Sequence, residues 1–161
     1  MEAALVFPML ISVFLGVSEF SQAFTVKRRL ETAANTAADL VARTASVATA
    51  DLTGIKAMID EILKPYSTTP LGLTISSVVA DQDNATRVAW SYAQGSGATA
   101  RTSGAAVSLP PNLTEPNSSI IFAEVNYTFR STLAHMIIGD VAFTAEAYLR
   151  PRASAQVTKS D

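Results

Sequence analysis

Two carboxylates, Glu2 and Glu19, lie in an N-terminal run that is otherwise almost entirely apolar. An ionised carboxylate inside a bilayer costs several kcal/mol unless a cation or a hydrogen-bond donor meets it. Glu2 can act as a favourable negative charge at the start of a helix at the membrane interface. Glu19 would lie inside the span, or at the interface if the span ends near Val17. The chemistry that both residues offer is ion pairing.

The other residues provide little for catalysis or for holding a cofactor. The chain of 161 residues has no cysteine and one histidine, His135, which excludes disulfides, thiolate metal sites and sites that need two imidazoles. A Ser-His-Asp arrangement has only this one possible base, so we expect His135 to be an ordinary surface or packed residue. The net charge of −2 gives no basic surplus for nucleic acid. We therefore expect no enzyme, no cofactor and no nucleic-acid partner.

Two polar segments in the second half of the chain offer further sites. Asp81, Asp83 and Asn84 carry oxygens suited to calcium, but they lack the spacing and the distal Glu of a calcium-binding loop. Residues 95–119 are rich in Gly, Ser, Thr, Pro and Asn and predict a long loop, which is either a partner-contacting surface or a connector. N-glycosylation patterns, which a Ser- and Thr-rich chain matches by chance, begin at Asn84, Asn112, Asn117 and Asn126.

The apolar run predicts a helix that begins in a membrane and continues beyond it. Residues 3–26 are long enough to span a bilayer. Beyond them, apolar residues recur at helical spacing in a narrow, alanine-rich stripe as far as Leu52. Pro8 is expected to kink the helix or to start it afresh, and Gly54 to end it. The prediction is one helix over residues 1–53, with a membrane or filament-core half at 1–26 and an amphipathic half at 27–53.

The rest of the chain predicts a globular head over residues 54–152. A short amphipathic helix is expected at 55–64, where Pro65 ends it. Alternating, β-branched and aromatic residues predict four strands, at 71–80, 86–94, 120–132 and 141–152. The fold class is therefore α+β, in which a long hydrophobic N-terminal helix packs on a small, mostly antiparallel sheet. Residues 153–161 are expected to form a loose C-terminal tail.

The stretch EAALVFPMLISVFLGVSEFSQAFTVKRRLETAA resembles the N-terminal signature of the TadE-like pilins and pseudopilins of tight-adherence (Tad) systems. In that family a Glu opens the apolar run, a Pro follows, a Gly and a Glu-Phe pair close it, and an aromatic and basic residues come next. The matching positions are Glu2, Pro8, Gly16, Glu19, Phe20, Phe24, Arg28 and Arg29. Beyond this stretch, the chain agrees with type IV pilin-like proteins only in its layout.

The resemblance implies a structural subunit of a Tad-type type IV pilus, used for surface attachment. Such a subunit waits in the inner membrane and then polymerises through its N-terminal helix, with copies of itself or related pilins, into an extracellular pilus or a periplasm-spanning pseudopilus. Further partners would be a prepilin peptidase and the pilus assembly machinery. Family precursors carry a basic leader that the peptidase removes, so we expect a mature N-terminus a few residues before Glu2. Without such a leader, the basic cluster at 27–29 would keep the head in the cytosol.

The resemblance also implies roles for the two carboxylates. Glu2 would pair with the N-terminal amine of a neighbouring subunit and so favour docking in one register. Glu19 would meet Lys27, Arg28 or Arg29 of an adjacent, axially shifted subunit. An alternative function stays open, namely a singly membrane-anchored extracytoplasmic binding or sensor domain that uses the sheet and the loop at 95–119.

Overall fold

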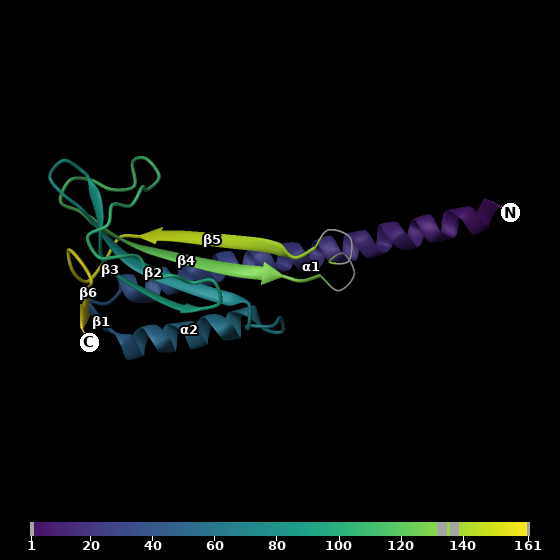
Figure 1. Cartoon of the computed structure of the whole chain (residues 1–161), viewed down its shortest axis with the longest axis horizontal. Helices are drawn as coiled ribbons and strands as arrows, with labels where there is room; N and C mark the ends of the chain where they lie inside the picture. Colours follow the sequence, from purple (N-terminus) through teal and green to yellow (C-terminus); the bar gives the residue numbers. More distant parts are fainter. Residues whose placement is uncertain (1, 132–134, 136–138, 161) are drawn as a thin grey trace.

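A long helix projects from a head in which a second helix and a sheet pack together (Figure 1). The computed structural model describes residues 2–131, 135 and 139–160, with the backbone alone at residues 2–5. The predicted fold class is confirmed, because a long apolar helix packs on a four-stranded antiparallel sheet.

Helix α1 (Glu2–Ala42) is continuous through Pro8, so it is not started afresh there. The Ser12 hydroxyl donates to the Pro8 carbonyl oxygen at 2.8 Å. The helix ends at Ala42, and the prediction of one helix to residue 53 is wrong. The next residues turn, form the short strand β1 (Ser46–Ala48) and then enter helix α2 (Thr49–Leu63).

Tertiary packing explains this early end of α1. Helix α2 folds back along α1, and Arg29 Nη1 donates to the Ile62 carbonyl oxygen at 2.8 Å near the end of α2. Four apolar side chains of α2 are buried as a result, namely Leu52, Ile55, Ile59 and Leu63. A straight continuation of α1 would leave them in water, and burial of apolar surface is the dominant favourable contribution to folding.

Two further predictions about this region are corrected. Gly54 lies inside α2 and does not end a helix. The helix predicted at 55–64 begins earlier, at Thr49, where the Asp51 carboxylate accepts the Ala48 N–H at 2.9 Å and satisfies one of the free donors of the first turn.

The four predicted strands are present as one sheet. They are β2 (Leu71–Ala80), β3 (Thr86–Gly95), β4 (Ser119–Phe129) and β5 (Val141–Leu149), in the order β3-β2-β4-β5 with every neighbouring pair antiparallel. β4 and β5 stop before the predicted residues 132 and 152. After β5 the Arg152 N–H donates to the Ala42 carbonyl oxygen at 2.7 Å, so this residue closes the end of α1 instead of extending the strand.

Small residues on both sides bring α1 close to the sheet. The alanines of α1 that lie in the core are Ala33, Ala34, Ala37, Ala38 and Ala42, and those of β4 and β5 are Ala123, Ala145 and Ala147. Because alanine has only a methyl group, the helix and the sheet can approach with few gaps. This confirms that the head packs on the second half of α1, from Val26 onward.

The C-terminal tail is not loose. β6 (Thr158–Ser160) pairs in parallel with β1 and forms a second, two-stranded sheet. Val157 is fully buried, and the Trp90 indole N–H donates to its carbonyl oxygen at 2.8 Å. A strand of three residues is too short to show a recognisable alternation of apolar and polar side chains. Its pairing depends on the distant segment that it meets.

Candidate functional site

The N-terminal half of α1 exposes large apolar side chains on all sides. Those from Val6 to Phe24 are all exposed, and Phe14 and Phe20 each reach 72 %. The helix is long and apolar enough to cross a membrane by length and composition, and only 6 % of its most apolar window is buried. In a core helix of a soluble protein, most of this apolar window would be buried. The exposed apolar surface of α1 is therefore suited to lipid or to other helices.

Glu19 finds a partner within its own chain. The Ser131 hydroxyl, just after β4, donates to the Glu19 carboxylate, although 112 positions separate the two residues. Glu19 is half-buried as a result. His135 Nδ1 lies 2.8 Å from the Ser131 carbonyl oxygen. Since the histidine contacts the carbonyl and the glutamate takes the hydroxyl, the three residues do not align as a nucleophile and its base.

This contact places Glu19 at the boundary between the head and the apolar half of α1. From Glu2 to Glu19 the helix rises about 26 Å, at 1.5 Å per residue, which is close to the ~30 Å hydrocarbon thickness of a bilayer. The two carboxylates therefore bracket a segment of membrane length, which favours the interfacial interpretation of Glu19. Glu2 begins α1, and its side chain lies outside the described residues.

The three residues of the basic cluster at 27–29 differ in their contacts. Arg29 is half-buried and donates to the carbonyl oxygens of Ile62 and Lys64, which otherwise have no helical partner at the end of α2. The Arg28 guanidinium lies over the Phe24 ring, 4.8 Å from its centroid, and Lys27 is exposed. Pairing of this cluster with Glu19 of a neighbouring subunit stays a prediction.

The remaining residues predicted to take part in assembly lie on the exposed surface of α1. Pro8, Gly16, Phe20 and Phe24 are all exposed, and the rings of Phe20 and Phe24 stack at 6.4 Å. A Cβ added at Gly16 would meet nothing within 4 Å. The surface near Gly16 is therefore open, as close approach of another helix requires.

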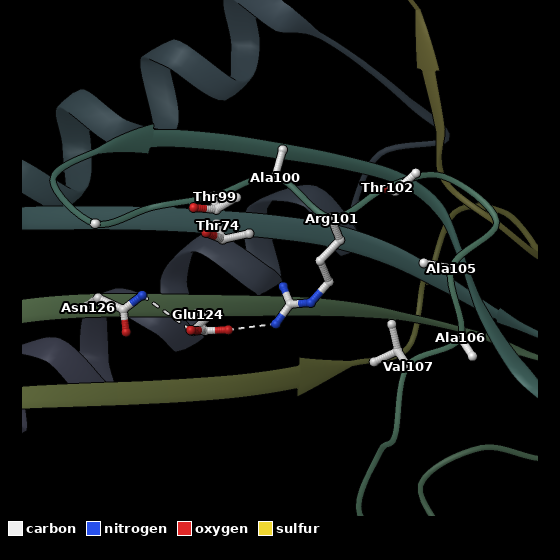
Figure 2. Close-up of a pocket in the computed structure, with 11 residues that line it drawn as sticks. Thr74, Thr99, Ala100, Arg101, Thr102, Ala105, Ala106, Val107, Glu124 and Asn126 are labelled. Carbon is white, nitrogen blue, oxygen red and sulfur yellow. Dashed lines mark hydrogen bonds and ion pairs between the residues drawn. The ribbon is translucent and has the colours of Figure 1, made fainter.

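A pocket of mixed polar and apolar lining lies on the outer face of the sheet, opposite α1, beneath the segment that follows β3. Figure 2 shows Arg101 pointing from that segment toward Glu124 on β4. The pocket has a volume of about 540 Å³. Its lining combines hydroxyl, amide and charged groups, among them Thr74, Thr99, Thr102 and Asn126, with the apolar side chains of Ala100, Ala105, Ala106 and Val107. Such a lining can hydrogen-bond a small polar molecule.

Arg101 is held at the pocket by several groups. Its guanidinium lies 2.7 Å from the Glu124 carboxylate and 4.4 Å from the centroid of the Phe122 ring. Its backbone N–H donates to Ser91 Oγ at 3.0 Å. Sequence reasoning missed Arg101, and the available signal was that it is the only cation within residues 95–119.

The long segment at 95–119 packs on the sheet instead of standing clear of it. It leaves β3 at Gly95, whose φ of +99° favours glycine, and a Cβ at Gly72 would lie 2.2 Å from the Ser96 carbonyl oxygen. Its apolar side chains Val107, Leu109 and Leu113 form a second, smaller core with the sheet. The segment is therefore a covering layer of the outer face and is more than a connector.

Asp81, in the turn between β2 and β3, uses its carboxylate within the backbone. Its Oδ1 accepts the N–H groups of Asp83 at 3.0 Å and Ala85 at 2.8 Å. This arrangement stabilises a turn. Within the described part of the chain, no group of three or more His, Cys, Asp or Glu could hold a metal ion.

The pKa values of Asp39 and Tyr148, which both lie outside the apolar segment, are shifted. A hydrogen bond from Arg43 lowers the pKa of Asp39 below its ordinary value of 3.8; burial opposes this, and the charges of Arg43 and Arg152 add to it. Burial, together with the hydrogen bond to Glu146, raises the pKa of Tyr148 far above its usual range. Both groups hold parts of the head together, so neither indicates acid–base chemistry.

Comparisons with curated proteins and with solved structures yield no match. A family model described as TadE-like protein matches residues 1–39, the segment that contains the exposed apolar half of α1 and most of its buried alanines. The match ends before the head, so it describes the helix and leaves the sheet and the pocket without a family. The resemblance expected from Glu2, Pro8 and Glu19 is thereby confirmed, and residues 1–39 of this chain are similar to the TadE-like family.

Proposed function

We propose that the protein is a pilin-like structural subunit that polymerises through its N-terminal helix into a Tad-type type IV pilus filament. The TadE-like match supports a Tad pilus-associated protein, and the apolar helix fits a membrane anchor. The observation that carries the proposal is the change along α1, from exposed large apolar side chains before Phe24 to buried alanines beyond Val26. The same helix thus lies in two environments. Its own head buries the part beyond Val26, whereas the part before Phe24 needs lipid or other helices around it.

The proposed cycle has two states. In the first, the apolar half of α1 lies in the inner membrane, with Glu19 near the surface. In the second, the helix leaves the lipid and packs against helices of the same or related subunits. Lipid and neighbouring helices are similarly apolar, so polar groups and close packing set the register of assembly. In this proposal Glu2, Lys27 and Arg28 provide those polar groups, and the exposed surface at Gly16 provides the close approach.

The proposal places the assembled protein outside the inner membrane. Its partners are a prepilin peptidase, the assembly machinery and other pilin-like subunits, and the filament serves surface attachment. It involves no catalysis, cofactor or nucleic acid. Heterologous contacts between subunits that all point the same way give an open filament.

Immunogold electron microscopy of the producing cells tests this function. Antibody against the head is applied to surface structures sheared from wild-type cells and from cells that lack the protein. We expect labelled filaments in the first sample, and in the second either no filaments or far fewer. The proposal is wrong if no filament carries label and the deletion leaves filament number unchanged.

The pocket at Arg101 favours a second candidate, the membrane-anchored binding or sensor domain. Its test is a thermal shift of the full-length protein in detergent, with a panel of neutral monosaccharides and amino acids at millimolar concentration. Binding would raise the unfolding temperature of the wild type. Arg101→Met should abolish that shift, whereas Lys64→Met, at an exposed ion pair just after α2, should keep it. The absence of any shift across the panel counts against this candidate.

A further inference from the structure

The pocket on the outer face of the sheet holds one charge of each sign, and the two are paired. Among the described residues that line it, Arg101 and Glu124 are the charged ones, and the guanidinium lies 2.7 Å from the carboxylate. A ligand with a net charge would meet a like charge beside the opposite one, and juxtaposed like charges are unfavourable. The pocket is therefore suited to a neutral ligand.

Both partners of this ion pair can form further hydrogen bonds. Arg101 also donates to Ser76 Oγ at 3.3 Å, and Glu124 also accepts from Asn126 Nδ2 at 3.2 Å. A guanidinium has more N–H donors, and a carboxylate more lone pairs, than these contacts use. The pair thus offers donors to a ligand directly beside acceptors.

Thr74 adds a hydroxyl at the floor of the pocket. Its neighbours on β2, Leu73 and Ile75, lie in the core on the α1 side, so Thr74 points to the outer face. Thr74 is only 3 % exposed, yet within the described part of the chain its hydroxyl has no hydrogen-bond partner. Polar groups of buried residues are nearly always hydrogen-bonded, so this hydroxyl needs a partner from the pocket side, either water or a ligand.

Polar and apolar groups lie beside each other in the lining. Figure 2 shows hydroxyl and amide groups to one side of Arg101, from Thr74, Thr99 and Asn126, and mostly small apolar side chains to the other, from Ala105, Ala106 and Val107. A sugar ring presents both kinds of surface, with hydroxyls at its edge and C–H groups on its faces. The volume of about 540 Å³ lies within the range of small-molecule sites, roughly 300–1,000 Å³.

We propose that this pocket binds a neutral saccharide through Arg101, Glu124 and Thr74. The inference rests on the second candidate function, because it names the class of ligand for that same pocket. A hydroxyl both donates and accepts, so neighbouring hydroxyls of one sugar can accept from Arg101 and donate to Glu124 while the ion pair stays intact. Hydrogen bonds to charged groups are stronger than those between neutral groups. The ammonium and carboxylate of a free amino acid would instead compete with the pair.

The site is arranged before any ligand binds. Asn126, which donates to Glu124, accepts the Thr144 hydroxyl at 3.0 Å, and the Arg101 guanidinium lies over the Phe122 ring. Groups that are fixed in advance lose little conformational freedom on binding. The pocket lies on the face of the sheet opposite α1, so packing of the apolar half of α1 in lipid or against other helices leaves it open.

Saturation-transfer difference NMR of the full-length protein tests this inference, in a detergent without a sugar headgroup. The probes are glucose, galactose and mannose at millimolar concentration, the uronate and the amino sugar of each, and the amino acid serine. We expect signals from the ring protons of at least one neutral sugar. In titrations its two charged counterparts should bind about tenfold more weakly, because each meets a like charge in the pocket.

Variants at Thr74 separate a role in binding from a role in folding. Thr74→Val removes the hydroxyl and keeps a similar shape, so the affinity for the sugar should fall about tenfold, whereas Thr74→Ser should retain most of it. Since the hydroxyl has no partner in the free protein, Thr74→Val should not lower the unfolding temperature. Thr128 is exposed on the outer face of β4 and lies outside the pocket, so the control Thr128→Val should bind like the wild type.

Several results would overturn the inference. They are no signal from any neutral sugar, equal binding of a sugar and its charged counterparts, unchanged affinity in Thr74→Val, or an equal loss in Thr128→Val. Binding of serine without binding of any sugar would also overturn it, but would leave the second candidate function standing. None of these readouts requires a filament, so a failure of the pilin function is observed separately.

Discussion

At the scale of single residues, Arg101 joins parts of the head that are distant in sequence. It connects the segment after β3 to β4 through Glu124, and to β2 through Ser76, whose Oγ accepts a guanidinium N–H at 3.3 Å. The side chains of Arg101 and Glu124 are only 26 % and 21 % exposed. An ion pair with so little contact with water is costly to break from one side, since it leaves the other charge without its partner.

Replacement of Arg101 by methionine should destabilise the head. We expect Arg101→Met to lower the free energy of unfolding by about 1–3 kcal/mol, because Glu124 loses its charged partner. Urea unfolding of the full-length protein in mild detergent, followed by the fluorescence of the single tryptophan, Trp90, measures this. Lys64→Met at the exposed pair with Glu61 should change it by less than about 0.5 kcal/mol. Equal effects of the two variants would contradict this role of Arg101.

Asp39 should contribute to the acid sensitivity of the protein. Its pKa is lower in the folded state than its ordinary value of 3.8, because Arg43 and Arg152 surround it. A lowered folded pKa gives stability that is present above the unfolded value and is lost as the pH falls through the folded one. Asp39→Asn should therefore make stability less dependent on pH below about pH 4.

Urea midpoints of wild type and Asp39→Asn, each measured at several pH values on both sides of about pH 4, check this prediction. Arg43→Met serves as a second variant, because it removes the main cause of the shift and should flatten the same part of the profile. Profiles of equal slope in wild type and both variants would show that Asp39 does not contribute.

At the scale of elements, the boundary between α1 and α2 illustrates how packing overrides local signals. Glycine commonly follows the end of a helix, yet Gly54 lies within α2. The actual break, at residues 43–45, contains neither glycine nor proline. It lies there because α2 must fold back to bury Ile59 and Leu63 against the rest of the core.

Gly54→Ala tests whether Gly54 lies inside a helix or ends one. Inside a helix, with no atom within 4 Å of the added methyl group, alanine should raise the free energy of unfolding by about 0.5–1 kcal/mol. Gly72→Ala should instead lower it by about 1–3 kcal/mol, because its Cβ would collide with the Ser96 carbonyl oxygen. Urea unfolding measures both changes. A loss of stability in Gly54→Ala would mean that Gly54 ends a helix after all.

At the scale of the whole molecule, the protein is divided along α1 into two parts with different surroundings. The head buries its own core, whereas the segment from Val6 to Phe24 buries almost none of its apolar surface. Glu19 and Ser131 mark the boundary between these parts. The molecule as drawn in Figure 1 is therefore complete only when lipid or other helices surround the projecting half of α1.

A charge in the middle of the projecting segment should impair membrane insertion. Leu10 is 61 % exposed and lies midway between Glu2 and Glu19. Lysine at the centre of a span costs about 2.5–3.5 kcal/mol on insertion scales, so Leu10→Lys should shift protein into the carbonate-extractable fraction. Phe24→Lys, next to the head, should behave nearly like the wild type because lysine there can reach the interface. Equal extraction of the two variants would argue against a span centred at Leu10.

The sequence by itself determined the features that depend on neighbouring residues. The apolar run of α1 and the four strands follow from local composition and periodicity, which directly set helix and strand preference. The resemblance to TadE-like proteins rests on individual residues at the start of the chain. The predicted strand at 71–80 agrees with β2 at both ends. The packing of the alanine stripe on the sheet follows from the same patterns.

Only the tertiary structure decided the features that join distant residues. The end of α1 at Ala42, the pairing of β6 with β1, the contact of Ser131 with Glu19 and the place of Arg101 above Glu124 belong to this group. Each depends on which segments meet in space, and the free energy gained by burying apolar surface there outweighs the preference of a few residues for helix or coil. The place of β5 at one end of the four-stranded sheet is decided in the same way, since it exists only once the order of the strands is set.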